Sequence, residues 1–375
     1  MSIKVLIGNL FESKSQTLVN TVNCIGIMGK GIAQEFKKHY PEMFKDYKSL
    51  CDRGAVQLGQ PYIFRTLYDK AIINFPTKKH WRSVSRVEDI INGLDYFIEK
   101  YKEWGVTSIA FPPLGCGNGG LEWDVLGPLM YQKLSSLDID VEIYAPYGTS
   151  NQKITEKFLA SHCDLRQRNT RNMHKQKVKP EWLPLLEIIY RLQKQPYANP
   201  VGRTIFQKIC YTVTEMEVDT GFVFRQSAYG PFSPQIKSAL TVLANSNLIF
   251  EKQLGRMTAL RIGSEYEKLR NQNLDVIDRF HNIIEKVTDL FIRIKNTHQA
   301  EEVSTVLFSC RQLKQETKRV RVSEEEVFNY IMNWKKSWNT EEKKYSVASA
   351  IRNLGMLSWI KTDFSASLDV GGLEI

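Results

Sequence analysis

Residues 17–33 have the sequence TLVNTVNCIGIMGKGIA, in which a short apolar segment runs directly into glycines at the expected start of a helix. Glycine permits positive φ and lets main-chain N–H groups approach a ligand closely, and a helix N-terminus adds the positive end of a dipole. A strand that ends in such a turn predicts a binding site for a diphosphate.

Two further glycine-containing turns follow expected strands. One is Gly8-Asn9-Leu10, and the other is PPLGCGNGGL at 112–121, with four glycines within six residues. A single glycine-rich loop is weak evidence, because tight turns need glycine in any case. Two such loops at strand-to-helix junctions, one preceded by a pair of asparagines, favour phosphate binding over a purely structural role.

The first 147 residues alternate short apolar segments with amphipathic ones. This alternation predicts a layered α/β fold, because strands and helices that alternate along the chain form a sheet covered by helices. Strands are expected at 3–7, 17–20, 62–65, 71–75, 108–111 and 141–145, and helices at 31–50, 87–104 and 123–134.

The pattern changes from Pro180 onward, where helical segments dominate. Helices are expected at 182–193, 201–214 and 234–244, followed by two short strands within 248–262 that Gly255-Arg256 separates. Two helices and a two-stranded wing in this order are typical of a winged-helix-like unit. The remainder, 264–375, is predicted to be mainly helical.

The chain of 375 residues is long enough for two or three domains, each with its own core. With 42% hydrophobic and 25% charged residues it has the composition of a soluble protein, and no segment approaches the ~20 apolar residues of a membrane span. Its six cysteines form no CxxC pair and no metal-ligand spacing with histidine. We therefore expect a cytoplasmic protein with no metal and no cofactor.

The formal net charge of +10 is concentrated in one short segment. Residues 1–150 hold 17 Lys and Arg against 16 Asp and Glu, whereas 151–180 hold 8 against 2. Such a run is most simply a solvated linker, and it can also hold a phosphate backbone near an enzyme by a salt-sensitive attraction.

The strings VNTVN, GIMGKGIA, NFPTK and PPLGCGNGGL resemble the macrodomain family, and within it the DarG-type DNA ADP-ribosyl glycohydrolase antitoxins. The resemblance spans residues 1–147 and implies a three-layer α/β/α macrodomain with a mixed sheet, whose crevice holds ADP-ribose. It places Gly8, Asn9 and Leu10 by the adenine and Asn20 and Asn23 by the distal ribose. The remaining ADP-ribose-binding residues that it implies are Thr21, Met28, Gly29, Gly31, Ile32, Ala33, Thr77, Gly115, Cys116, Gly117, Asn118, Gly119, Gly120 and Leu121.

Two departures from the family pattern bear on chemistry. Many macrodomains have aspartate where this chain has Asn9, whose amide oxygen can still accept the adenine amino proton. Related lysine-dependent hydrolases carry an aspartate in the glycine loop where this chain has Gly119, so the carboxylate role is vacant or is filled by water or by the substrate. Cys116 is expected to be a packed thiol and not a nucleophile.

Lys78, in the segment Asn74-Phe75-Pro76-Thr77-Lys78, is the predicted catalytic residue. A lysine at a strand end beside a crevice can lose its proton more readily than an exposed one and attack a sugar carbon. In related glycohydrolases the matching lysine is proposed to attack the anomeric carbon of the distal ribose. The alternative is that Lys78 neutralises phosphate, together with Lys79, His80 and Arg82.

The resemblance implies an antitoxin that removes ADP-ribose from a thymidine base of single-stranded DNA and binds its cognate DNA ADP-ribosyltransferase toxin. The expected domains are a macrodomain at 1–150, a basic linker at 151–180, a winged-helix-like unit at 181–263 and a helical, toxin-binding region at 264–375. Two alternatives stay open: an ADP-ribose reader without turnover, and a transcriptional regulator whose winged helix contacts DNA while the macrodomain senses a nucleotide.

Overall fold

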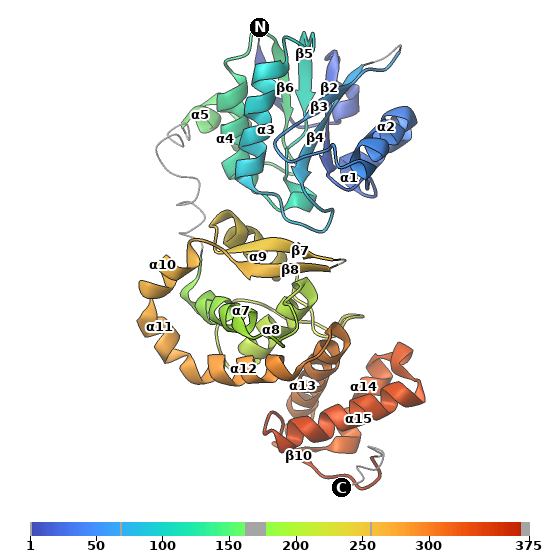
Figure 1. The fold of residues 1–375 in the computed structure, drawn as a ribbon, viewed down its shortest axis with the longest axis vertical. Helices are drawn as coiled ribbons and strands as arrows, with labels where there is room; N and C mark the ends of the chain where they lie inside the picture. Colours follow the sequence, from blue (N-terminus) through green and yellow to red (C-terminus); the bar gives the residue numbers. More distant parts are fainter. Residues whose placement is uncertain (1, 68–69, 162–177, 256, 369–375) are drawn as a thin grey trace. The chain divides into compact units, whose positions relative to one another are not determined.

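The computed structural model describes residues 2–67, 70–161, 178–255 and 257–368. Two compact units make up the chain, one of residues 1–178 with 237–247 and one of residues 179–236 with 248–375 (Figure 1). Most of the basic segment expected as a linker lies outside the described residues, because residues 162–177 are not among them. The boundaries of the four expected regions stay predictions.

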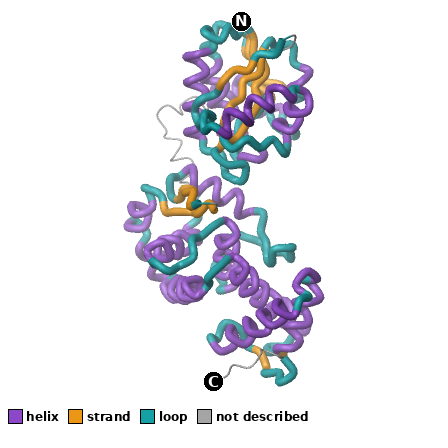
Figure 2. Tube along the Cα trace, turned by 45° about the vertical axis from the view of Figure 1, so that its right-hand side comes forward, coloured by secondary structure: helices purple, strands orange, loops and turns teal. Residues whose placement is uncertain are grey.

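A six-stranded sheet forms the centre of the first unit (Figures 1 and 2). Its spatial order is β1-β6-β5-β2-β4-β3, and all neighbouring strands are parallel except the antiparallel pair β3–β4. The strands are β1 (Ile3–Leu6), β2 (Thr17–Asn23), β3 (Tyr62–Phe64), β4 (Ala71–Lys78), β5 (Ser108–Phe111) and β6 (Asp140–Tyr144). The sheet is therefore mixed, and its five parallel strands end at one common edge.

Helices cover both faces of this sheet. Because side chains alternate along a strand, Leu18 packs on one face and its neighbour Val19 on the other. The Leu18 face is covered by α1 (Gly31–His39) and α2 (Pro41–Asp52), and the Val19 face by α3 (Val87–Lys100), α4 (Trp123–Leu134) and α5 (Glu156–Ser161). The predicted three-layer α/β/α arrangement is confirmed.

The prediction of one helix over 31–50 is wrong. The chain forms two helices there, because Pro41 has no N–H to donate and its ring disfavours a helical conformation at Tyr40, whose φ is −131°. Proline then suits the first position of the second helix. Strands β2 and β4 also continue beyond the expected 20 and 75, because main-chain pairing persists through Asn23 and Lys78, whose polar side chains break the apolar pattern.

The second unit is mainly helical, as predicted. Its principal elements are α7 (Leu183–Lys194), α8 (Arg203–Glu215), β7 (Ile249–Leu254), β8 (Met257–Ile262), α10 (Tyr266–Asn271), α11 (Leu274–Arg279), α12 (His281–Arg293), α13 (Thr297–Thr317), α14 (Glu324–Trp334) and α15 (Glu341–Met356). Helix α9 (Gln235–Asn245) precedes the antiparallel pair β7–β8 in sequence. The winged-helix interpretation of α8, α9 and this pair stays a prediction.

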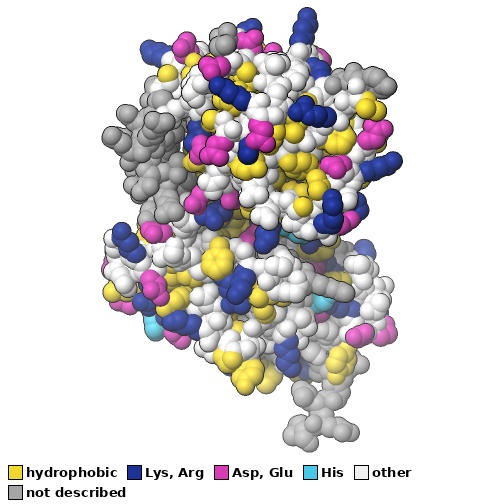
Figure 3. Space-filling model, turned by 45° about the horizontal axis from the view of Figure 1, so that its top comes forward, with side chains coloured by type: hydrophobic (Ala, Val, Ile, Leu, Met, Phe, Trp, Pro, Cys, Tyr) yellow, Lys and Arg dark blue, Asp and Glu magenta, His cyan; other side chains and the backbone are white. Residues whose placement is uncertain are grey.

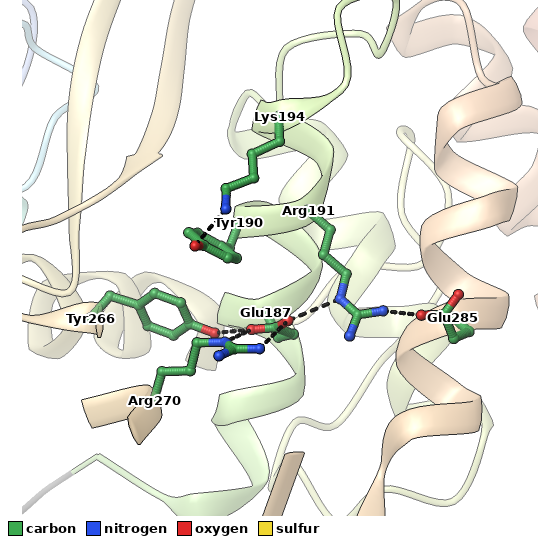
Figure 4. A network of polar contacts seen from close by, with 7 residues as sticks. All are labelled: Glu187, Tyr190, Arg191, Lys194, Tyr266, Arg270 and Glu285. Atoms are coloured by element: carbon green, nitrogen blue, oxygen red, sulfur yellow. Dashed lines mark hydrogen bonds and ion pairs between the residues drawn. The ribbon is translucent and has the colours of Figure 1, made fainter. Parts of the chain in front are cut away.

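A buried carboxylate joins the helices of the second unit (Figure 4). Glu187 on α7, 1% exposed at its side chain, accepts hydrogen bonds from the Tyr266 hydroxyl at 2.6 Å and from Nε of both Arg270 and Arg191 at 2.9 Å. Arg191 also contacts Glu285 on α12. A buried charge needs such partners, and this network ties α7 to α10 and α12.

Charged side chains of both signs are intermixed on one face of the molecule. The face shown in Figure 3 has lysines and arginines beside acidic residues and scattered hydrophobic ones. This agrees with the near balance of charge over residues 1–150. Among the helices that the structure describes, none combines the length and the apolar character needed to cross a membrane.

Candidate functional site

The carboxyl ends of β2 and β4 lie beside each other at one edge of the sheet. The two strands pair in parallel from Thr17 opposite Ala71 to Asn23 opposite Lys78. The side-chain nitrogen of Lys78, Nζ, donates a hydrogen bond of 3.2 Å to the main-chain oxygen of Asn118 in the third glycine turn. The sheet thus brings the predicted catalytic lysine and this turn together, although they are 40 residues apart in the sequence.

Helix α1 begins next to the same turn. A Cβ atom on Gly31, whose φ is +60°, would lie 3.3 Å from Asn118 Nδ2. Gly29, Lys30 and Gly31 are exposed, no side chain caps this helix, and its first turn contains no acidic residue. The first N–H groups of α1 therefore have room for an anion such as a diphosphate.

The turn at 115–121 depends on its glycines for conformation and for space. Gly115, Gly117 and Gly120 have φ values of +70°, +69° and +82°. At Gly119 a Cβ atom would lie only 2.3 Å from Ser85 Oγ, and the Ser85 N–H donates to the Gly119 oxygen at 2.9 Å. Packing against Ser85 thus fixes the turn in addition to its backbone angles.

Cys116 lies in this turn as a thiol. Burial raises its pKa from 9.0 to about 12, so the sulfur is protonated at neutral pH. The thiolate is the reactive form of cysteine, and this environment therefore disfavours Cys116 as a nucleophile.

The first turn, Gly8-Asn9-Leu10, leads into a single 3-10 turn. Asn9 is exposed, and its Oδ1 accepts from the Phe11 N–H at 3.1 Å while its Nδ2 donates to Glu12 at 3.3 Å. The amide oxygen has a second lone pair, so it can cap this turn and still accept a proton from an adenine amino group.

Asn23 shapes the loop that follows β2. Its Oδ1 accepts from the N–H groups of Ile25 at 3.0 Å and Ile27 at 3.4 Å, and its Nδ2 donates to the Ile27 oxygen at 2.6 Å. The Tyr47 hydroxyl, from α2, donates to the main-chain oxygen of Asn23 at 2.8 Å. Asn23 thus holds the loop in one conformation, and its contact with the distal ribose stays a prediction.

Asn20 is fully buried beneath this loop. Its Nδ2 donates to Asn74 Oδ1 at 2.9 Å, and Asn74 Nδ2 donates in turn to the Tyr62 hydroxyl at 3.2 Å. Asn20 Oδ1 has no hydrogen-bond partner among the described residues. The predicted contact with the ribose would have to be made by this oxygen.

The other predicted binding residues surround these groups at different depths. Thr77 is buried, with its hydroxyl 3.4 Å from the main-chain oxygen of Val22. Met28 and Leu121 are also buried, whereas Thr21, Ile32 and Ala33 are partly exposed and Gly117 and Asn118 are exposed.

Asp89 is an acidic residue that the sequence analysis did not single out. It lies in the first turn of α3, and burial raises its pKa above the usual value although Arg86 opposes the shift. The charges of Asp89 and Lys79 both act on Cys24, whose N–H donates to the Lys79 oxygen at 3.1 Å. The signal in the sequence was an acid at an expected helix start, shortly after the lysine segment. Asp89 thus adds an acidic group to the first turn of α3, which follows the segment that carries Lys78 in the sequence.

Within residues 2–67, 70–161, 178–255 and 257–368, no group of three or more His, Cys, Asp or Glu side chains is placed to hold a metal ion. The described part of the site can contact a ligand through main-chain N–H groups, side-chain amides and a lysine.

Comparison with known proteins shows which family the chain is related to. The Macro domain family model matches residues 19–129. The chain is also 34% identical over 281 residues to the "DNA ADP-ribosyl glycohydrolase" of Mycobacterium tuberculosis, which covers 72% of this chain and 74% of the relative. The chain belongs to the DNA ADP-ribosyl glycohydrolase family. Because 72% of the chain is more than its first 178 residues, the family likeness includes part of the second unit.

Two further matches cover a smaller share of the chain. The chain is 35% identical over 163 residues to a "DNA ADP-ribosyl transferase-DNA ADP-ribosyl glycohydrolase fusion protein" of Thermosipho africanus, covering 39% of this chain and 42% of that protein. A solved structure of the macrodomain of Mycobacterium tuberculosis DarG is 46% identical, covers 39% of this chain and 98% of that one, and has a TM-score of 0.38.

Proposed function

We propose that this protein hydrolyses the N-glycosidic bond between ADP-ribose and a thymidine base of single-stranded DNA. The observation that carries the proposal is the position of Lys78 Nζ, within hydrogen-bond distance of the glycine turn that adjoins the open N-terminus of α1. A diphosphate at α1 and the turn would leave the distal ribose near the lysine.

The chemistry needs a nucleophile and a proton. The neutral amine of Lys78 attacks the anomeric carbon of the distal ribose, the bond from that carbon to the base nitrogen breaks, and the base takes up a proton. Water then releases ADP-ribose from the lysine and restores the amine. We infer that Asp89, in the first turn of α3 shortly after the lysine segment, supplies or relays this proton.

The experiment compares two substitutions of the same residue. Lys78→Arg keeps a cation near the phosphates, but a guanidinium stays protonated and cannot act as the nucleophile, whereas Lys78→Ala removes both properties. If Lys78 is the nucleophile, both variants lose release of ADP-ribose from modified oligonucleotide by orders of magnitude, and only Lys78→Ala also loses some ADP-ribose affinity. Retained turnover in Lys78→Arg would establish the phosphate clamp instead.

The partner of this activity is a cognate DNA ADP-ribosyltransferase toxin. The proposal is supported by the Thermosipho africanus relative, whose name joins a transferase and a glycohydrolase in one chain. We assign toxin binding to the helical region at 264–375. The protein then acts as an antitoxin in two ways, by reversing the modification and by holding the toxin.

Two other functions remain testable alternatives. A reader of ADP-ribose has no need of a lysine at this strand end, and the Lys78 variants decide that point. A transcriptional regulator would read DNA through α9, but among the early polar residues of this helix only Gln235 and Lys237 are suited to contact bases. We therefore favour docking of a protein partner by the region after Pro180 over reading of DNA by α9.

A further inference from the structure

An exposed tryptophan follows the predicted catalytic lysine. Trp81 is 41% exposed, although a large aromatic side chain is ordinarily buried in a protein core. The His80 ring stacks on it with centroids 5.6 Å apart and planes inclined by 28°, and the Arg82 guanidinium carbon lies 4.4 Å from the indole centroid. We refer to His80, Trp81 and Arg82 as the Trp81 platform.

The backbone of the platform is held by two hydrogen bonds. The Arg82 N–H donates to Nδ1 of His80 at 3.1 Å, and the Ser83 N–H donates to the His80 oxygen at 2.9 Å. The first bond fixes the imidazole as an acceptor at Nδ1. The three flat side chains are thus presented by a tight turn, so that little conformational entropy is lost when a planar ligand stacks on them.

A second exposed apolar group lies on the neighbouring loop. Ile25 and Ile27 are 39% and 43% exposed, and the bonds to Asn23 hold their main chain in place. The N–H of Cys24 donates to the Lys79 oxygen, so this loop is paired with the segment that carries the platform. Exposed apolar side chains therefore lie on two segments that a main-chain hydrogen bond joins.

The charge of these segments is entirely basic. Between Asp69 and Glu88 the sequence contains Lys70, Lys78, Lys79, Arg82 and Arg86 and no acidic residue. Between Glu12 and Glu35 it contains Lys14 and Lys30 and again no acid. Residues 1–150 as a whole are nearly balanced, so this is a local excess. A planar ligand with a negatively charged backbone matches both the aromatic surface and the charge.

We propose that the Trp81 platform binds the single-stranded DNA next to the modified nucleotide, by stacking one of its bases and pairing Arg82 and Lys79 with its phosphates. The inference rests on the proposed function and names the residues that recognise the strand as opposed to the ADP-ribose. Trp81 is three residues from Lys78, so their Cα atoms are no more than roughly 11 Å apart. At roughly 3.4 Å per stacked nucleotide, the base concerned lies within about three positions of the modified one.

The test uses the full chain and three probes: free ADP-ribose, ADP-ribosylated thymidine as a single nucleoside, and a fluorescent single-stranded oligonucleotide with one central modified thymidine. Base stacking on an aromatic residue is worth about 1–3 kcal/mol by alanine substitution, which is roughly 5- to 150-fold in affinity. Trp81→Ala should therefore weaken oligonucleotide binding by at least fivefold and raise its KM. Affinity for ADP-ribose and turnover of the nucleoside should stay within twofold of wild type.

Matched variants separate stacking from charge and from loss of fold. Trp81→Phe keeps an aromatic face and should recover most of the lost affinity. Arg82→Ala should reduce the salt dependence of oligonucleotide binding, whereas Lys102→Ala, which removes an exposed lysine just beyond the carboxyl end of α3, should leave it unchanged.

The outcomes also separate this inference from the proposed function. If the wild type releases ADP-ribose from both substrates but Trp81→Ala binds the oligonucleotide as tightly as wild type does, the platform proposal is wrong and the proposed function stands. If the wild type shows no turnover, the proposed function is wrong, and the oligonucleotide affinities of wild type and Trp81→Ala still test the platform proposal. A wild type that prefers an acidic peptide over the oligonucleotide would also overturn it.

Discussion

Asn20 and Asn74 lie directly opposite each other on adjacent parallel strands and share a hydrogen bond of 2.9 Å between their side-chain amides. Neither side chain is accessible to solvent. The pair connects the centre of the sheet to Tyr62 on the edge strand β3. The shared hydrogen bond satisfies Asn20 Nδ2 and Asn74 Oδ1, whereas the buried Asn20 Oδ1 has no hydrogen-bond partner among the described residues.

The first prediction follows from this pair. Asn20→Ala should lower the free energy of unfolding by about 1–3 kcal/mol, because Asn74 Oδ1 is left buried without its donor. The affinity of the folded protein for ADP-ribose should change by less than threefold, since Asn20 is not accessible. Thermal melting and calorimetric titration measure the two quantities. An unchanged melting temperature with a tenfold loss of affinity would instead place Asn20 in contact with the ribose.

The second prediction concerns the N-terminus of α1. At Gly29 a Cβ atom would meet nothing closer than Ile27 Cγ2 at 3.9 Å, so this position accepts a side chain, whereas a side chain at Gly119 collides with Ser85. Gly29→Glu should lower ADP-ribose affinity at least tenfold by repelling the diphosphate, and Gly29→Gln should lower it far less. The same glutamate should leave the melting temperature unchanged or raise it, because acids near a helix N-terminus are stabilising. Equal affinities in the two variants would argue against an anion at α1.

The third prediction is a pH dependence in the second unit. Burial favours the neutral form of Glu187, but hydrogen bonds from Arg270, Tyr266 and Arg191 outweigh it and hold its pKa below the usual 4.5. A lowered pKa in the folded state stabilises the protein above pH 4.5, and this contribution is lost as the pH falls below that value.

Glu187→Gln should therefore lower the free energy of unfolding of the second unit at pH 7 by up to about 3 kcal/mol. This value is the low end for a broken buried ion pair, because Arg191 and Arg270 both retain some exposure. The loss of stability relative to wild type should become smaller as the pH is lowered toward 3. Hydrogen exchange of the α7 amides in urea, compared with the exposed control Glu267→Gln on α10, measures it. A deficit that is independent of pH would show that the charge of Glu187 is not what stabilises the network.

The fourth prediction separates the two proposed activities by truncation. A fragment ending at 150 would lose Leu159 of α5, which is 1% exposed and packs in the core with residues of α4, so the N-terminal fragment should run to Ser161. Residues 1–161 should release ADP-ribose from DNA but should be less stable than the full chain, because residues 237–247 also belong to the first unit. Residues 178–375 should inhibit the toxin stoichiometrically without hydrolysing anything. Titration of each fragment into a transferase assay tests both. A C-terminal fragment that leaves the toxin active and binds its own promoter duplex would favour the regulator.

Features with a local signal were predictable from the sequence. Glycine turns at 26–31 and 115–121, the strand cores and the position of Lys78 at a strand end all follow from residues within a few positions of each other. The break at Pro41 also has a local signal, because a proline interrupts an otherwise continuous amphipathic pattern. The prediction of one helix over 31–50 gave more weight to the amphipathic pattern than to the proline.

Features that depend on distant contacts were not predictable. Besides its predicted contact with the distal ribose, Asn23 holds the loop at Ile25 and Ile27, a role that no pattern in the sequence indicates. The packing of Ser85 against Gly119, which leaves no room for a Cβ atom there, arises only when the chain is folded, because the two residues are far apart in the sequence. The exposure of Trp81 likewise required the fold, since sequence alone favours burial of tryptophan.

The protonated state of Cys116 and Cys24 bears on how the protein withstands oxidants. Peroxide attacks the thiolate, and burial raises the pKa of both cysteines to about 12, so both sulfur atoms stay protonated at pH 7. Enzymes that depend on an ionised cysteine lose activity when peroxide oxidises it. The groups proposed here for binding and catalysis are glycine N–H groups, amides and lysine, so the proposed chemistry does not depend on a thiolate that peroxide would oxidise.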